Sequence, residues 1–321
     1  MQQGNTAPSL QSSQREDIAA LDRAAEALGN ILLGKQDQIV LALACLLARG
    51  HLLIEDLPGL GKTMLAQSIA RVLDLEFRRI QFTSDLLPAD IVGVSVFRKS
   101  RGEFEFQPGP VFSQLLLADE VNRATPKAQS ALLEAMEENQ VSVDGSTRPL
   151  PTPFFVVATQ NPADQVGTFP LPESQLDRFL MRLELGYPDP ASEREIITGH
   201  DRRQLLESAE PVLGPADVLE LQATASRVHL SEAIVDYIQA LVRQTRESAE
   251  IEIGLSPRGA QALASAARAH ALLRRHPGVF PDDVQAVFAA VAGHRLKAAG
   301  ASGRRNPADI CRHVLDTVAI P

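Results

Sequence analysis

Residues 50–73 read Gly-His-Leu-Leu-Ile-Glu-Asp-Leu-Pro-Gly-Leu-Gly-Lys-Thr-Met-Leu-Ala-Gln-Ser-Ile-Ala-Arg-Val-Leu, and this stretch decides the fold. An apolar run typical of a strand enters a glycine-containing loop, and an amphipathic run typical of a helix leaves it. The loop ends in Gly61-Lys62-Thr63, in the strand-loop-helix context that a phosphate-binding loop requires. Backbone N–H groups of such a loop and of the helix N-terminus favour an anion.

The residue types at the end of the loop suit a nucleotide with Mg²⁺. Lys62 would reach the β- and γ-phosphates, and Thr63 would place its hydroxyl on the metal ion. The other residues expected around the phosphates are Pro58, Gly59, Leu60, Gly61 and Met64. The strict pattern has glycine five residues before Gly61, where this chain has Asp56. A chance Gly-Lys-Thr in a loop is the alternative, and the flanking elements and a second motif disfavour it.

Composition is that of a globular protein large enough for two domains. The chain has 321 residues, 45% of them hydrophobic and 22% charged, with a net charge of −9. The acidic balance and the absence of tryptophan argue against a nucleic-acid binder. No apolar run reaches the length of a membrane span. We expect residues 1–15 to be a disordered tail that lacks the features of a signal peptide, and Cys45 and Cys311 to be buried thiols in a reducing cytoplasm.

Two regions differ in their hydrophobic pattern, and the boundary is expected near residue 188. Residues 16–48 are expected to be helical, and from 51 to about 187 short apolar strands alternate with helices, which predicts a mostly parallel sheet covered on both faces. The expected elements are helices at 17–28, 36–48, 62–73, 126–139 and about 173–179, with strands at 52–55, 77–82, 111–118, 154–158 and 181–185. From 188 to 321 the pattern predicts helices only, at 193–206, 216–228, 232–248, 257–275 and 282–296.

The second motif is the apolar run that ends in Asp119-Glu120. It would deliver two carboxylates to the carboxyl end of a strand, where open α/β sheets bind ligands. Asp119 would hold Mg²⁺, and Glu120 would polarise the water that attacks the γ-phosphate. A third strand ends before Asn161-Pro162, and the Asn161 amide would orient that water. A solvated strand end and a plain Asn-Pro turn are the corresponding structural alternatives.

These motifs together resemble an AAA+ ATPase, and four segments of the sequence are similar to the MoxR family. The segments that carry the resemblance are Asp-Glu-Val-Asn-Arg-Ala-Thr-Pro-Lys-Ala-Gln-Ser-Ala-Leu-Leu-Glu-Ala-Met (119–136), Ala-Thr-Gln-Asn-Pro (158–162), Pro-Leu-Pro-Glu-Ser-Gln-Leu-Asp-Arg-Phe (170–179) and Leu-Ser-Pro-Arg (255–258). The resemblance covers about residues 16–320. It implies an α/β P-loop NTPase core with a parallel sheet flanked by helices, followed by an all-α lid.

The resemblance also implies roles for individual residues. Lys62 and Thr63 become the Walker A pair, and Asp119 and Glu120 the Walker B pair. Asn161 becomes sensor 1, Arg178 the arginine finger for a neighbouring subunit, and Arg258 sensor 2. Ser256-Pro257 independently places Arg258 in the first turn of a helix, where the dipole disfavours a cation unless a phosphate is near.

Some further roles rest on the resemblance more loosely. Gln81 would be the switch residue that holds Glu120 away from its catalytic position until a partner binds. Arg123 would act on a neighbour or within the subunit. Adenine would sit near Leu33-Gly34-Lys35-Gln36, so Gly34 and Lys35 are candidate nucleotide contacts.

Two hairpins are expected as insertions in the core. Residues 96–110 resemble a helix-2 insert, and residues 140–151 resemble a pre-sensor hairpin. In such assemblies these hairpins face a central pore. Arg98, Lys99 and Arg101 would contact an acidic partner, with a plain solvated hairpin tip as the alternative.

The expected function is that of an ATP-hydrolysing chaperone that matures or remodels a protein complex, often a metal-containing enzyme. The resemblance implies a homo-oligomeric ring, expected to be hexameric, with ATP, ADP and Mg²⁺ as ligands. It also implies a von Willebrand factor A-domain partner and a client protein. The alternatives are a metal-chelatase motor subunit, a nucleic-acid motor and a nucleotide-dependent scaffold without turnover. Intact Glu120, Asn161, Arg178 and Arg258 argue against the scaffold.

Overall fold

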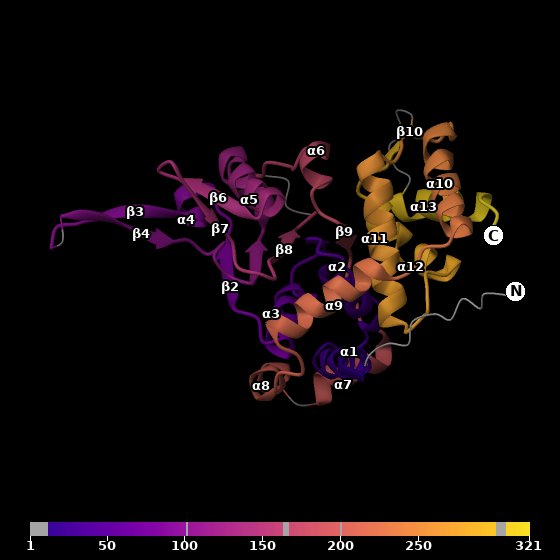
Figure 1. The fold of residues 1–321 in the computed structure, drawn as a ribbon, viewed down its shortest axis with the longest axis horizontal. Coiled ribbons are helices and arrows are strands. Elements are labelled where there is room, and N and C mark those ends of the chain that lie inside the picture. The colour runs from indigo at the N-terminus through magenta and orange to yellow at the C-terminus, as the bar shows by residue number, and fades with distance from the viewer. Residues whose placement is uncertain (1–11, 101, 163–166, 200, 300–305) are drawn as a thin grey trace, which may run out of the picture.

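A computed structural model describes residues 12–100, 102–162, 167–199, 201–299 and 306–321. Its centre is a five-stranded, wholly parallel sheet in the order β2–β5–β8–β1–β9 (Figure 1). The strands are β1 (Leu52–Glu55), β2 (Phe77–Gln81), β5 (Leu115–Asp119), β8 (Phe155–Gln160) and β9 (Met181–Leu183). The predicted sheet is therefore confirmed.

Side chains on the central strands alternate between two buried cores. Leu52 and Ile54 of β1 face one core, and Leu53 between them faces the other. Because successive side chains of a strand point to opposite faces, a strand covered on both faces must be apolar throughout. The helices around the sheet are α1 (Ser12–Ile31), α2 (Gln36–Leu47), α3 (Lys62–Val72), α4 (Pro88–Val92), α5 (Pro126–Glu138) and α6 (Glu173–Leu176), with a 3₁₀ turn at Val121–Arg123.

Two hairpins leave this core. The first, β3 (Gly93–Arg98) with β4 (Glu103–Pro108), projects far from the body, and the second is β6 (Gln140–Val143) with β7 (Ser146–Pro149) (Figure 1). Phe97 and Phe104 lie opposite each other on the projecting hairpin, 50% and 72% exposed. Both expected hairpins are therefore present. Arg101 lies outside the described residues.

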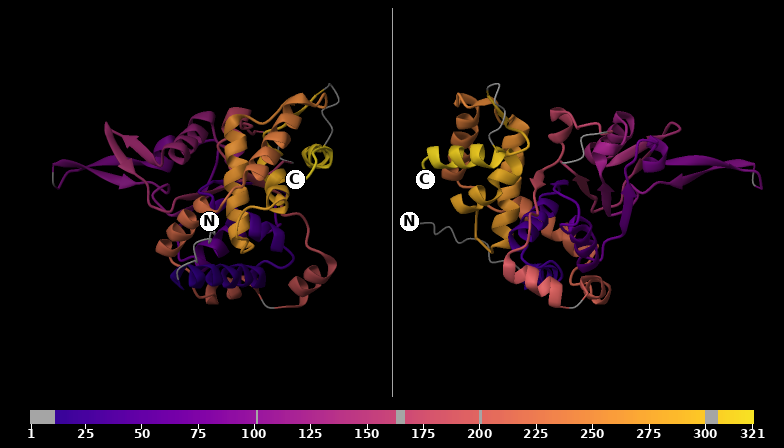
Figure 2. Two further views of the ribbon diagram at one scale, coloured as in Figure 1. Left: turned by 45° about the vertical axis from the view of Figure 1, so that its right-hand side comes forward. Right: turned by 180° about the vertical axis from the view of Figure 1, so that it is seen from behind.

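The second region is mainly helical, as predicted. It contains α7 (Pro190–Thr198), α8 (Arg202–Ser208), α9 (Pro215–Arg227), α10 (Glu232–Glu247), α11 (Pro257–Leu273), α12 (Pro281–Ala292) and α13 (Pro307–Thr317). Helices α10–α13 lie at the end of the molecule away from the β3–β4 hairpin (Figures 1 and 2). Helices α7 and α8 lie beside α1, and α8 also contacts α3. The boundary at 188 stays a prediction.

Several expected element bounds were wrong. Residues 12–15 belong to α1 rather than to a tail, while Met1–Gln11 lie outside the described residues. Residues 111–113 form a turn before β5 and not the start of the strand that their sequence pattern predicts. The helix expected at 193–206 is divided because α7 ends at Gly199 and Asp201 caps α8.

The second region also holds elements that the sequence pattern did not indicate. A short antiparallel ribbon joins β10 (Ile251–Ile253) to β11 (Lys297–Ala298), and α13 follows it. Both cysteines are buried and free, as expected. None of the helices in the described part of the chain has the length and apolar character that a membrane crossing needs.

A buried carboxylate fastens α11 to α12 in the lid. Asp283 is fully buried and accepts hydrogen bonds from His270 Nδ1 at 2.8 Å and His276 Nδ1 at 2.9 Å. It also accepts one from the Phe280 amide, which closes the start of α12. Burial acts to raise the pKa of Asp283, but the hydrogen bonds from His270, Phe280 and His276 outweigh it and the pKa lies below its ordinary value. The ionised form is thus the one that the fold stabilises.

We expect Asp283→Asn to lower the free energy of unfolding by about 2–4 kcal/mol at pH 7, since it leaves buried donors poorly matched. Because the folded pKa is lowered, this contribution is present above the unfolded pKa of about 4 and is lost as pH falls through the folded value. Urea unfolding at pH 7, 4 and 3 measures both effects, because the acid-dependent loss falls below pH 4. Asp282→Asn, at the exposed neighbouring position, is the matched control. Equal acid sensitivity of Asp283→Asn and wild type would contradict this assignment.

Candidate functional site

The phosphate-binding loop joins the end of β1 to the start of α3. Gly59 and Gly61 have φ values of 86° and 95°, a region that favours glycine. Gly61 occupies the position before α3, so Lys62 and Thr63 form the first turn of that helix. The first amides of a helix have no partner within it, so the start of α3 suits an anion. The loop thus has the conformation that its sequence predicts.

Lys62 is the central cation of the loop. Its Nζ donates to the main-chain oxygens of Asp56 and, at 3.1 Å, Leu57. Burial lowers the pKa of Lys62, and the charges of Asp56, Asp119 and Glu120 oppose that shift. The ammonium therefore lies between the loop and the acidic pair, where a phosphate would exchange with the loop carbonyls.

Asp56 explains the departure from the strict glycine pattern. Its carboxylate accepts hydrogen bonds from the Leu57 amide at 2.8 Å and from the Gly186 amide at 2.7 Å. Gly186 follows β9 and leads to the second region. A glycine at position 56 could not make this contact, so the aspartate ties the phosphate-binding loop to the start of the second region.

Lys35 belongs to the same junction. Only 6% exposed, it donates to the carbonyls of Leu185 at 2.8 Å and Gly186 at 2.9 Å. Burial lowers the pKa of Lys35, against the charges of Asp56 and Asp189. A Cβ at Gly34 would lie 2.7 Å from the Ser192 hydroxyl. The two residues expected near adenine therefore pack against the start of the second region, and their nucleotide role stays a prediction.

The acidic pair lies at the carboxyl end of β5, beside the end of β8. Thr159 Oγ1 donates to Asp119 Oδ1 at 2.5 Å and accepts the Glu120 amide at 2.9 Å. Arg79 of β2 donates to Asp119 Oδ2 at 2.7 Å. Neighbouring strands thus orient the Asp119 carboxylate and the Glu120 main chain, and neither Thr159 nor Arg79 was singled out from the sequence.

The side chains of Gln81 and Arg123 restrict the conformation of the Glu120 side chain. Its Oε2 accepts a hydrogen bond from Gln81 Nε2 at 2.9 Å and pairs with Arg123 Nε at 3.0 Å. Its φ of 55° turns the chain sharply after β5. The Gln81 contact matches the switch position expected from the sequence, and the Arg123 contact is within the subunit.

A cavity of about 340 Å³ brings these motifs together. Its lining residues are Pro58, Gly59, Gly61, Lys62, Thr63, Met64, Gln67, Asp119, Glu120, Asn161 and Arg203. All three predicted motifs therefore meet at one edge of the sheet. Leu60, although in the loop, does not line the cavity.

Arg203 was not foreseen. It lies in α8, which Arg71 of α3 holds in place by donating to the Ala209 carbonyl at 2.7 Å. Arg202 anchors the other end of α8 by donating to the Asn30 carbonyl at 3.0 Å. An exposed arginine in a charged helix has no sequence signal of its own; only the docking of α8 on α3 brings it to the cavity.

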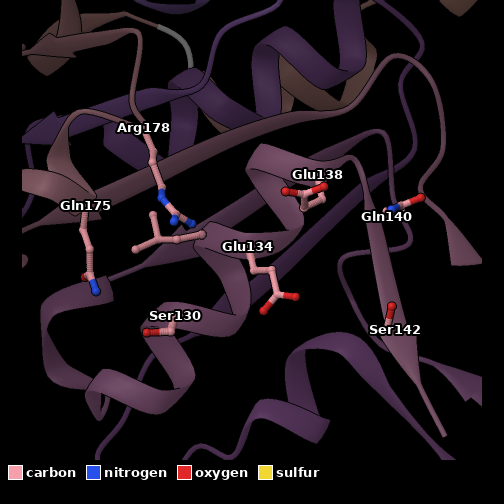
Figure 3. Close-up of a pocket in the computed structure, with 8 residues that line it drawn as sticks. Ser130, Glu134, Glu138, Gln140, Ser142, Gln175 and Arg178 are labelled. Carbon is pink, nitrogen blue, oxygen red and sulfur yellow. The ribbon is translucent and has the colours of Figure 1, made fainter. Parts of the chain in front are cut away.

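The two other predicted arginines lie elsewhere. Arg178 enters a separate polar pocket of about 510 Å³ formed with α5 and β6 (Figure 3). Arg178 pairs with Glu137 at 2.9 Å, and Arg258 pairs with the same carboxylate at 3.1 Å. This pocket shares no lining residue with the phosphate-side cavity. Neither arginine lines the cavity formed by the chain's own phosphate-binding loop.

Comparison with known proteins agrees with this geometry. Residues 51–181 match the family described as "ATPase family associated with various cellular activities (AAA)", and residues 243–313 match the AAA lid domain. The chain is 46% identical to the uncharacterized protein YeaC of Bacillus subtilis over 283 residues, 88% of each chain. It is 40% identical to the chaperone MoxR1 of Mycobacterium tuberculosis over 316 residues, 95% of this chain and 83% of that protein.

A crystal structure of a putative ATPase from Cytophaga hutchinsonii is also similar, with a TM-score of 0.86 and 35% identity. The alignment covers 97% of this chain and 98% of that one. The fold and cavity define an AAA+ P-loop ATPase with a helical lid. The chain belongs to the MoxR family of these ATPases. The expected family and fold class are confirmed.

Nucleotide affinity tests the assignment of Arg203 to the cavity. We expect Arg203→Gln to weaken binding of ATP about tenfold or more, because a hydrogen bond from a charged donor to a phosphate is lost. Titration of a fluorescent ATP analogue measures it, with Lys62→Ala as the variant that loses binding. Arg194→Gln, an exposed arginine of α7 that does not line the cavity, is the matched control. Affinities of Arg203→Gln and wild type within twofold would contradict the assignment.

Proposed function

We propose that the protein is a Mg²⁺-dependent ATP hydrolase that works as a ring of identical subunits and remodels a client protein complex. The observation that carries this proposal is that the residues of the phosphate-side cavity and the two predicted catalytic arginines lie in separate places. Lys62, Asp119, Glu120 and Asn161 line one cavity, whereas Arg178 and Arg258 meet at Glu137 outside it. A second copy of the chain would bring the missing arginines to the phosphates.

Within the cavity, each residue has a distinct task. The loop amides and Lys62 bind the phosphate chain. Thr63 and Asp119 supply the hydroxyl and carboxylate oxygens that suit Mg²⁺, an ion that takes few protein ligands and completes its shell with phosphates and water. When bound, this ion would neutralise charge on the phosphate oxygens. Both Asp119 oxygens already accept hydrogen bonds from Thr159 and Arg79, so Asp119 would act through the ion's water shell.

Hydrolysis needs a base beside the terminal phosphate. Glu120 has the required carboxylate at the cavity wall, and Asn161, which lines the same cavity, would orient the attacking water. The hydrogen bond from Gln81 and the ion pair with Arg123 hold Glu120 in one orientation. Release of Glu120 from Gln81 would switch the site on.

Arg178 would act on the site of the neighbouring subunit. An arginine supplied in trans is worth about 10³–10⁵ in rate for related phosphoryl transfers. Glu137 holds Arg178 and Arg258 together on one surface, which offsets the repulsion between two guanidinium groups. In the ring, a phosphate group would take the place of Glu137 as their anionic partner.

The client-facing elements would be the two hairpins. The β3–β4 hairpin extends from the body (Figure 2). Its Phe97 and Phe104 side chains are exposed. Exposed apolar side chains surrounded by polar residues are typical of surfaces that bind another protein. The chaperone name of the MoxR1 relative supports remodelling as the output. A von Willebrand factor A-domain partner and a metal-containing client complete the proposal.

A shared site makes turnover depend on subunit concentration. We expect the specific ATPase rate to rise with protein concentration, and Arg178→Ala to bind ATP normally but hydrolyse it at least about 10²-fold more slowly. Steady-state phosphate release across a concentration series measures both. Mixing Arg178→Ala with Lys62→Ala should restore part of the activity, because intact sites then meet intact arginines. A rate independent of concentration, with Arg178 dispensable, would show a self-contained site instead.

The Gln81–Glu120 hydrogen bond gives a separate prediction. We expect Gln81→Ala to raise basal hydrolysis about fivefold, since a net hydrogen bond of about 1 kcal/mol no longer restrains the carboxylate. Glu120→Gln should bind ATP but lose turnover, both alone and combined with Gln81→Ala. Single-turnover hydrolysis separates binding from chemistry. A fall in rate for Gln81→Ala would mean that Gln81 assists Glu120 rather than restrains it.

A further inference from the structure

Arg295 of the lid encloses the chain segment that carries Arg178. It follows α12, and its guanidinium donates to the Asp177 carboxylate at 2.6 Å. The same group donates to the main-chain oxygens of Asp177 at 3.1 Å, Phe179 at 2.7 Å and Leu180 at 3.1 Å. These contacts lie on both sides of Arg178 in the sequence. Arg295 thus contacts the main chain on both sides of Arg178, and His294 Nε2 adds a contact to the Phe179 carbonyl at 3.0 Å.

The Arg295 side chain is only 6% exposed, which makes this contact set specific. Burial lowers the pKa of Arg295, and the hydrogen bond and charge of Asp177 oppose that shift. A buried guanidinium is costly unless its donors are matched, and here one rigid fork meets four acceptors of the Arg178 segment as well as the Val291 carbonyl of α12. An arginine is therefore required where packing alone would have accepted an apolar residue.

The lid reaches this segment through a second contact as well. Helix α12 packs against β9, the edge strand that begins directly after Leu180. Arg258 of α11 lies 3.9 Å from Asp177 and pairs with Glu137, which in turn holds Arg178. One charged network thus links two lid elements to the Arg178 side chain.

We propose that Arg295 is a positioning residue for the neighbouring subunit's site. It fixes the direction of Arg178, so the lid of one subunit completes the catalytic centre of the next. This inference rests on the proposed function, in which sites are shared between subunits. Misplacing a catalytic group by about 1 Å costs about 10²-fold in rate, so loss of the enclosing side chain should be felt in catalysis.

Complementation between variants tests this role. Arg295→Met should bind ATP as wild type does but hydrolyse it about 10²-fold more slowly when assembled alone. Its own phosphate-side residues are intact, so mixing with Lys62→Ala, which keeps a working Arg178, should restore activity. Mixing with Arg178→Ala should not, because neither subunit then presents a correctly aimed arginine. Arg295→Met and Arg178→Ala would therefore fall into one complementation group.

A purely structural role would give a different pattern. Restoration of activity by Arg178→Ala, or full activity of Arg295→Met alone, would overturn the inference. Arg268→Met is the matched control, since Arg268 is a lid arginine that donates to the Val228 carbonyl at 3.1 Å and does not contact the Arg178 segment. It should behave as wild type in every mixture.

Two further variants keep the test decisive if Arg295→Met does not fold. Arg295→Lys keeps the charge but loses the fork, and Asp177→Asn removes the counter-ion, so both should join the Arg178→Ala group with smaller losses. Thermal unfolding checks that each variant is folded. If Lys62→Ala and Arg178→Ala do not restore each other, the shared-site function itself is wrong and the positioning role fails with it.

Discussion

The parallel pairing of β5, β8 and β1 is the constraint on which the site depends. Ala118 lies opposite Ala158, and Leu53 of β1 lies opposite the same residue, so the three strands end at one edge. Apolar side chains bury both faces, which leaves the carboxyl ends as the place where polar groups can gather. The Thr159 hydroxyl shows the result, since it orients Asp119 and the Glu120 amide together.

A second polar junction attaches the rest of the molecule to this edge. Asp56 and Lys35 both bind the backbone around Gly186, where the chain leaves the sheet. Movement of the second region would therefore be transmitted to the phosphate-binding loop through these bonds. The same region places α8 beside α3 and brings Arg203 to the cavity. The loop, its helix and the second region form one connected unit.

The cluster of charges around Arg178 has a different chemical character from the cavity beside the phosphate-binding loop. There Glu137 and Asp177 balance part of the charge of Arg178, Arg258 and Arg295. Three guanidinium groups in one place need such partners, because like charges at short range repel strongly in a partly buried setting. The cavity beside the phosphate-binding loop and the arginine cluster are thus separate places on one chain. This division is what a ring of identical subunits with shared sites requires.

The sequence by itself determined the parallel sheet, the phosphate-binding loop and the acidic pair. Local pattern suffices for these, because Gly61-Lys62-Thr63 and Asp119-Glu120 follow apolar strands directly. The break between α7 and α8 at Gly199 and the first residue of β5 were harder to predict from the sequence, since capping and burial decide them rather than hydrophobic periodicity. Only the tertiary structure decided that Thr159, Arg79 and Arg203 join the site and that Arg295 encloses the Arg178 segment. These contacts join residues far apart in the chain, and an isolated arginine or threonine carries no local pattern that distinguishes a buried contact from a solvated side chain.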